Sequence, residues 1–141
     1  MKKIFVDTNI LLDIFLERVP FFRPAQVLWT LAENRKIQAG ISALAVSHVF
    51  FIIQRKSSTD AAYKAITALT ETFRIVDTTS RVISKAMKDH FPDFEDGIQY
   101  HCALKFKAKA IISRDRRGFE KSKIPLMEAT EYLSVIGESI D

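Results

Sequence analysis

Short apolar runs alternate with helical stretches along the chain, and this alternation limits the possible folds more than any other feature. Each run is almost continuously apolar, which is typical of strands covered on both faces of a parallel sheet. The expected strands cover residues 3–6, 37–41, 73–76, 110–113 and 124–126. The expected helices cover residues 9–17, 25–34, about 43–55, about 60–71, 79–88, 94–106 and about 127–135.

This order predicts an α/β protein, namely a three-layer α/β/α sandwich with a short parallel sheet of four to five strands and helices on both faces. The 141 residues are 48% hydrophobic and 27% charged, so we expect one globular domain over residues 1–141. The sequence contains no apolar run long enough to span a bilayer and only one cysteine, so we expect a cytoplasmic protein without membrane contact.

Four aspartates follow strands or open a helix. Asp7 ends the first expected strand, Asp115 lies just beyond the fourth, and Asp93 and Asp96 open the helix over 94–106. Because sites in open α/β sheets form beyond the carboxyl ends of the strands, we expect these side chains to share one edge. Asp77, after the third strand, is a further candidate.

Clustered carboxylates repel one another unless a cation balances them, and oxygen ligands favour Mg²⁺ or Mn²⁺. Each aspartate also has a simpler explanation. Asp7, Asp93 and Asp96 are suited to helix caps, and Asp115 is suited to a turn. The simpler explanation is weaker for the four residues together than for any one of them, because all four are expected at one edge.

Positive charge is concentrated near the fourth strand. Residues 105–123 hold eight basic and two acidic residues, a net charge of +6, whereas the whole chain carries +4. Such a segment suits a polyanion such as RNA or DNA, although a solvated surface has the same composition. We interpret Arg114, Arg116 and Arg117, which flank Asp115, as contacts for substrate phosphates.

Three segments resemble the PIN domain family in order and spacing: Asp7-Thr8-Asn9, Asp93-Phe-Glu-Asp96 and Ser113-Arg-Asp115. The resemblance runs from Lys3 to about Leu133. It implies a Mg²⁺- or Mn²⁺-dependent nuclease, in most such proteins a ribonuclease. Many small members are toxins neutralised by an antitoxin protein, and a homodimer is expected from the same resemblance.

The resemblance assigns metal binding to Asp7, Asp96 and Asp115, with Asp93 as an additional acid. It makes Ser113 the hydroxyl residue before Asp115, and Thr8 and Asn9 the small polar residues beside Asp7. One position departs from the family pattern. Counting from Ser42, His48 occupies the place where the family usually has a glutamate.

His48 has two interpretations: a metal ligand or acid–base residue, or a side chain with no part in the site. Asp93 is a candidate to replace the missing charge. The resemblance therefore predicts an endoribonuclease acting on single-stranded RNA, with an antitoxin as a candidate partner. The alternatives are a catalytically weakened module that binds RNA or protein, and a metal-dependent nuclease or phosphatase with another substrate.

Overall fold

The computed structural model describes residues 2–140 and contains one five-stranded parallel sheet in the order β3-β2-β1-β4-β5. The strands are β1 (Lys3–Val6), β2 (Gln38–Ser42), β3 (Arg74–Val76), β4 (Ala110–Ile112) and β5 (Leu126–Met127). The helices are α1 (Thr8–Phe15), α2 (Phe22–Glu33), α3 (Ala43–Lys56), α4 (Thr59–Thr72), α5 (Ser80–Asp89), α6 (Phe94–Phe106) and α7 (Ala129–Val135).

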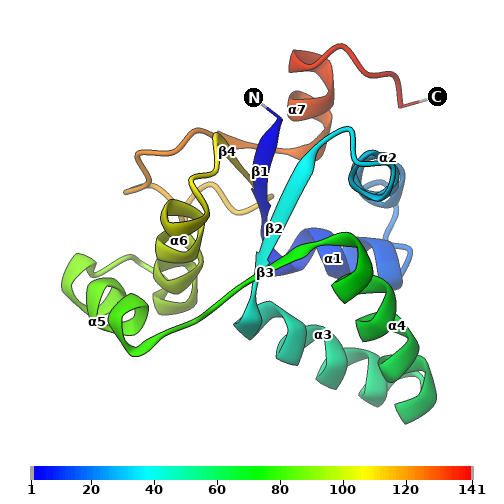
Figure 1. The fold of residues 1–141 in the computed structure, drawn as a ribbon, viewed down its shortest axis with the longest axis horizontal. Helices are drawn as coiled ribbons and strands as arrows, with labels where there is room; N and C mark the ends of the chain where they lie inside the picture. The colour runs from blue at the N-terminus through cyan, green and yellow to red at the C-terminus, as the bar shows by residue number, and fades with distance from the viewer. Residues whose placement is uncertain (1, 141) are drawn as a thin grey trace.

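The helices lie on both faces of the sheet, as the sequence predicts. In Figure 1, α5 and α6 lie on one side of the strands, and α1, α2, α3 and α4 lie on the other. The predicted three-layer α/β fold is therefore confirmed.

Alternation along β1 divides the core between the two faces of the sheet. Ile4 and Val6 join the apolar cluster that contains α1 to α4 and α7, whereas Phe5 joins the cluster under α5 and α6. All three side chains are fully or almost fully buried. A strand that is covered in this way must be apolar on both faces, which explains its continuous hydrophobic sequence.

Several boundaries differ from the expected ones by one to three residues. Helix α2 begins at Phe22 instead of residue 25, so Pro24 lies inside its first turn. Proline is tolerated there because the first amides of a helix have no partner in the helix. Strand β5 begins at Leu126 instead of residue 124, and Ile124 packs in the cluster under α5 and α6.

Between residues 2 and 140, every helix is too short or too polar to cross a lipid bilayer.

Candidate active site

Asp7 lies at the carboxyl end of the central strand β1 and caps the following helix. Its Oδ1 accepts a hydrogen bond from the Thr8 amide at 2.8 Å, which begins α1. Its own amide donates to the carbonyl of Ile112 in β4 at 3.0 Å, so the backbone of Asp7 is tied to the neighbouring strand. The side chain is 4% exposed, and burial raises its pKa. The capping role and the site role therefore coexist in one carboxylate.

Two side chains from other elements hold the Asp7 carboxylate in place. The Ser113 hydroxyl, just after β4, donates to Oδ2 at 2.8 Å. The Gln99 amide, from α6, donates to Oδ1 at 3.2 Å and to the Thr8 hydroxyl at 3.0 Å. Hydrogen bonds of this kind fix the orientation of a carboxylate, so Asp7 presents a defined geometry to the pocket.

Asp96 is a buried carboxylate in the first turn of α6. Asp93 caps this helix by accepting the Asp96 amide at 3.2 Å. Asp96 is 8% exposed, and its Oδ2 has no hydrogen-bond partner among residues 2–140. Burial raises the pKa of Asp96 to about 8, and the charges of Asp7, Asp93 and Asp115 act in the same direction. A raised pKa and an unpartnered oxygen are expected of a buried carboxylate that has no cation beside it.

Asp115 lies in the turn after β4, opposite Asp96. Its amide donates to the Ser113 hydroxyl at 3.0 Å, and its Oδ1 accepts the Gly118 amide at 2.9 Å. Gly118 lies directly against both carboxylates. A Cβ at this position would be 1.8 Å from Asp96 Oδ2 and 2.7 Å from Asp115 Oδ2. Only glycine leaves room for the two carboxylates to approach each other here.

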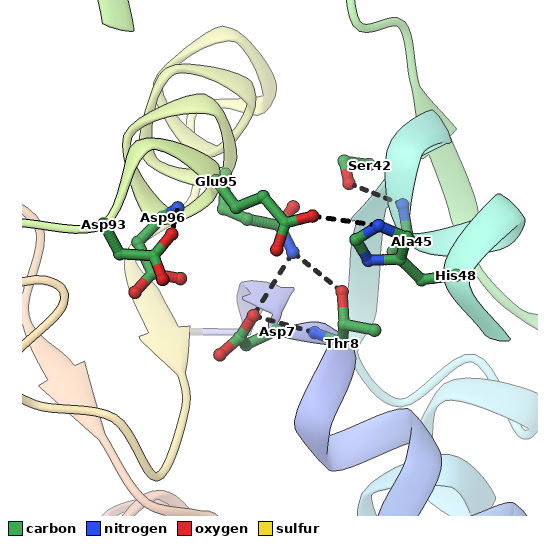
Figure 2. A network of polar contacts seen from close by, with 9 residues as sticks. Asp7, Thr8, Ser42, Ala45, His48, Asp93, Glu95 and Asp96 are labelled. Atoms are coloured by element: carbon green, nitrogen blue, oxygen red, sulfur yellow. Dashed lines mark hydrogen bonds and ion pairs between the residues drawn. The ribbon is translucent and has the colours of Figure 1, made fainter. Parts of the chain in front are cut away.

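These carboxylates converge on a cavity of about 210 Å³ at the carboxyl edge of the sheet. Figure 2 shows Asp93 and Asp96 at the start of α6 facing Asp7 at the start of α1. Six polar residues line the cavity besides these three aspartates, namely Thr8, Asn9, His48, Glu95, Gln99 and Asp115. The structure thus brings Asp7, Asp93, Asp96 and Asp115 together, whereas Asp77 does not line the cavity.

His48, in α3, contacts Glu95, in α6, with 2.9 Å between Nε2 and Oε1. Both side chains line the cavity and are partly exposed. In Figure 2, Glu95 extends from α6 toward His48. The chain therefore places a carboxylate beside His48, the position at which the sequence departs from the family pattern.

Arg114, next to Asp115, forms an ion pair with Asp13. Its guanidinium donates to both carboxylate oxygens of Asp13 in α1, at 2.9 and 3.0 Å, and lies 3.9 Å from the ring centroid of Phe21. Asp13 is fully buried. The cation is therefore committed to a structural ion pair and does not line the carboxylate cavity. Arg114 remains a predicted phosphate contact, and in this structure its guanidinium is engaged by Asp13.

The basic segment around Asp115 does not form a continuous rim. Arg116 pairs with Glu131 of α7, and Lys121 donates to the carbonyls of Asp89 and His90. Arg117 is exposed. Arg116 and Arg117 remain predicted phosphate contacts, because an exposed ion pair is worth little and exchanges readily for another anion.

Gln99, Glu95, Gly118 and Asp13 were not singled out by the sequence. Gln99 follows Asp96 by three residues in the same helix, so the helical period offered a signal for it. Glu95 stands inside the acidic run that opens α6. Gly118 and Asp13 matter because of their contacts with Asp96 and Arg114, which are distant from them in the sequence. No local sequence pattern indicates either contact.

The donor chemistry of the cavity fits a hard divalent cation. Asp96 offers an unpartnered buried oxygen. The pKa values of Asp7 and Asp96 are raised first by burial and then by neighbouring carboxylates, and a bound cation would oppose both effects. In the described part of the chain, no three Asp, Glu, His or Cys side chains already form a group able to hold a metal ion. The residue types therefore fit Mg²⁺ or Mn²⁺, while their present arrangement does not enclose one.

The chain is thus an α/β protein in which a parallel sheet flanked by helices carries a cavity lined by carboxylates at its carboxyl edge. The chain belongs to the PIN domain family, whose model matches residues 3–117. That match contains all four of the clustered aspartates.

The chain is similar to ribonuclease VapC1 of Aquifex aeolicus (strain VF5), with 28% identity over 137 residues that cover 93% of each protein. Among solved structures it resembles VapC20 of Mycobacterium tuberculosis, described as a sarcin–ricin loop cleaving toxin. That likeness has 17% identity and a TM-score of 0.68, and covers 84% of this chain and 94% of the other. VapBC2 of Rickettsia felis, bound to a DNA fragment from its promoter, gives 12% identity, a TM-score of 0.65, and coverage of 89% and 98%.

Proposed function

We propose that this protein is a metal-dependent endoribonuclease that hydrolyses phosphodiester bonds in single-stranded RNA. The observation that carries the proposal is the convergence of Asp7, Asp96 and Asp115, from three separate elements, on one small cavity. Membership of the PIN domain family and similarity to a protein named as a ribonuclease support it.

Asp7, Asp96 and Asp115 would hold the cation, with Asp93 at the entrance as a further acid. When bound, Mg²⁺ or Mn²⁺ supplies an activated water and stabilises negative charge on the phosphoryl group. Ser113 and Gln99 orient Asp7, and the backbone of Gly118 orients Asp115. Arg116 and Arg117 supply positive charge for the phosphates that flank the scissile bond.

The same proposal includes a protein partner. Among the similar solved structures are VapBC2 of Rickettsia felis and a toxin–antitoxin complex from Klebsiella pneumoniae, which matches with 20% identity and a TM-score of 0.65. We assign this chain the toxin role in a toxin–antitoxin pair, as a homodimer that acts on RNA in the cytoplasm. Copurification with the product of a neighbouring gene tests the pair, and light scattering of the purified protein tests the dimer.

Cleavage of single-stranded RNA in Mn²⁺ by the purified protein and its Asp7→Asn variant tests the activity. Asparagine still caps a helix, so the fold survives, while the loss of one anionic ligand lowers the rate roughly 100-fold or more. Asp77→Asn is the matched control because Asp77 also follows a strand but lies outside the cavity. Wild-type cleavage by Asp7→Asn would overturn the proposal.

One observation favours a second candidate, in which the module binds RNA without cutting it. The contact between His48 and Glu95 engages the side chain at the position where the family usually has a glutamate. RNA binding without cleavage in either Mg²⁺ or Mn²⁺ would select this candidate. Cleavage of DNA or of a phosphate monoester in preference to RNA would instead assign the same carboxylates another substrate.

A further inference from the structure

A second and larger cavity lies at the opposite edge of the sheet. Its volume is about 670 Å³, and it is bounded by the ends of α2 and α6 and the starts of β1, β2 and β3. Five cationic side chains line it, namely Lys3, Arg35, Arg74, Lys105 and Lys107, and no Asp or Glu among residues 2–140 does. The sequence distributes these cations over more than 100 positions, so only the fold brings them together.

Within residues 2–140, no ion pair neutralises the positive charge of this basic cavity. None of the five cations forms an ion pair within residues 2–140, whereas Arg114 and Arg116 are paired. The Lys3 ammonium lies 4.6 Å from the ring centroid of Phe106, which holds it at the cavity without cancelling its charge. Converging cations repel one another, so an anionic ligand would relieve them.

The floor of the basic cavity is built for close packing. Phe106 lies against the middle of β2, where a Cβ at Gly40 would be 2.8 Å from the ring. Buried Ile37 and Ala39 continue the apolar floor. Glycine in a strand interior often marks such a close approach. The cations thus surround an apolar base instead of projecting from a convex surface.

Favourable interactions at helix ends explain only part of the cluster. Arg35 and Lys107 follow α2 and α6, and Lys105 lies in the last turn of α6, where cations interact favourably with free carbonyl groups. Arg35 and Lys107 also have φ values of 60° and 61°, in the left-handed region that favours glycine. Lys3 and Arg74 begin strands, so the helix ends give no reason for their charges.

We propose that the basic cavity binds the sugar–phosphate backbone of RNA at a distance from the scissile bond. The identity of the polyanion rests on the proposed function, but the site does not share a residue with the carboxylate cavity. Lys3 and Asp7 stand at the two ends of β1, about 13 Å apart at the usual rise of a strand. Regularly spaced phosphates match several unpaired cations better than an ordinary protein segment does.

The test measures the binding of two RNAs, one of roughly 5 and one of roughly 30 nucleotides. All proteins carry Asp7→Asn, so that the RNA is not cleaved during the measurement. The variant Arg74→Gln/Lys105→Gln/Lys107→Gln removes three cavity cations. Its matched control, Arg55→Gln/Lys56→Gln/Lys64→Gln, removes three exposed cations from α3 and α4, which line neither cavity. Fluorescence anisotropy over a salt series reports affinity, and thermal unfolding shows that each variant is folded.

The cavity variant should bind the long RNA roughly tenfold or more weakly, and its logarithmic salt slope should fall by about 2. Binding of the short RNA, and all binding by the control, should stay unchanged. Equal loss in the cavity variant and the control, or no loss, overturns the proposal. Equally tight binding of a polyglutamate peptide would assign the cavity to an acidic protein instead. The proposed function is tested separately by cleavage of the short RNA by protein in which Asp7 is intact.

Discussion

Asp13 and Arg114 form a two-point ion pair in which both oxygens of a fully buried carboxylate accept hydrogen bonds from one guanidinium. Arg114 stands between Ser113 and Asp115, and Asp13 stands in the helix that Asp7 begins. The pair therefore fixes the loop that carries one carboxylate of the site against the helix that follows another.

Replacing Arg114 should reduce stability far more than RNA affinity. Arg114→Met leaves a buried carboxylate with only the more distant Arg18, at 3.6 Å, so the free energy of unfolding should fall by about 3 kcal/mol. Urea unfolding measures this change. Arg117→Met, on the exposed surface, is the control and should unfold like the wild type. A stable Arg114→Met protein with weakened RNA binding would instead support the prediction that Arg114 contacts phosphate.

The metal-free protein should lose stability as the pH rises. The folded-state pKa of Asp96 is about 8, above the ordinary value near 3.9, so the folded chain holds a proton that the unfolded chain releases. Between those values each increase in pH favours unfolding, and the raised pKa of Asp7 acts in the same sense. In EDTA, Tm should fall by at least about 5 °C between pH 5 and pH 8.

Asp96→Asn is the matched variant for this experiment. It removes the titrating group while keeping its shape, so its Tm should vary much less over the same pH range. Mn²⁺ should raise the wild-type Tm more at pH 8 than at pH 5, because bound cation competes with the proton. A flat wild-type profile would contradict the assignment of the raised pKa.

Gly118→Ala should disable the site with little effect on the fold. The added methyl group would lie 1.8 Å from Asp96 Oδ2, so the carboxylates must move apart. Misplacement of this size should lower the cleavage rate roughly tenfold or more. Gly97→Ala, beside Asp96, is the control, since its Cβ would lie 3.4 Å from the Cβ of Ala86. Its activity should match the wild type.

His48→Glu should increase the affinity of the site for a divalent metal ion. The substitution places a second carboxylate near Glu95, and repulsion of about 1 kcal/mol corresponds to roughly fivefold in metal affinity. The concentration of Mn²⁺ that gives half-maximal cleavage should fall accordingly. His48→Gln breaks the contact without adding charge and should leave this concentration unchanged. Equal behaviour of the two variants would exclude position 48 from the site.

The fold was largely predictable because the relevant signals are local. Strand β1 was predicted at its observed bounds, since its four apolar residues end at Asp7. The start of α2 was predicted too late, because Pro24 indicates a break in sequence but occupies a permitted first turn in the structure. The start of a helix depends on how the amides of its first turn are satisfied, and the spacing of hydrophobic residues contains no information about these amides.

The carboxylates were predictable because topology places the carboxyl ends of parallel strands together. The partners of the arginines were not, since pairing depends on which side chains the packed helices present. The basic residues that are close together in the sequence over 105–123 lie at different places in the folded protein. Lys105 and Lys107 line the basic cavity, whereas Arg114 joins Asp13 and Arg116 joins Glu131. A charge count along the chain does not contain this division.

The hydrogen bond from Gln99 to Asp7 crosses between the two apolar clusters, since α6 packs with one and α1 with the other. Neither layer contains the site by itself. During synthesis, a chain that ends before α6 already holds Asp7 but has no acidic cavity, and Asp115 is added only after α6 and β4. A cell making this protein would therefore be exposed to the activity proposed above only after residue 115 has been added.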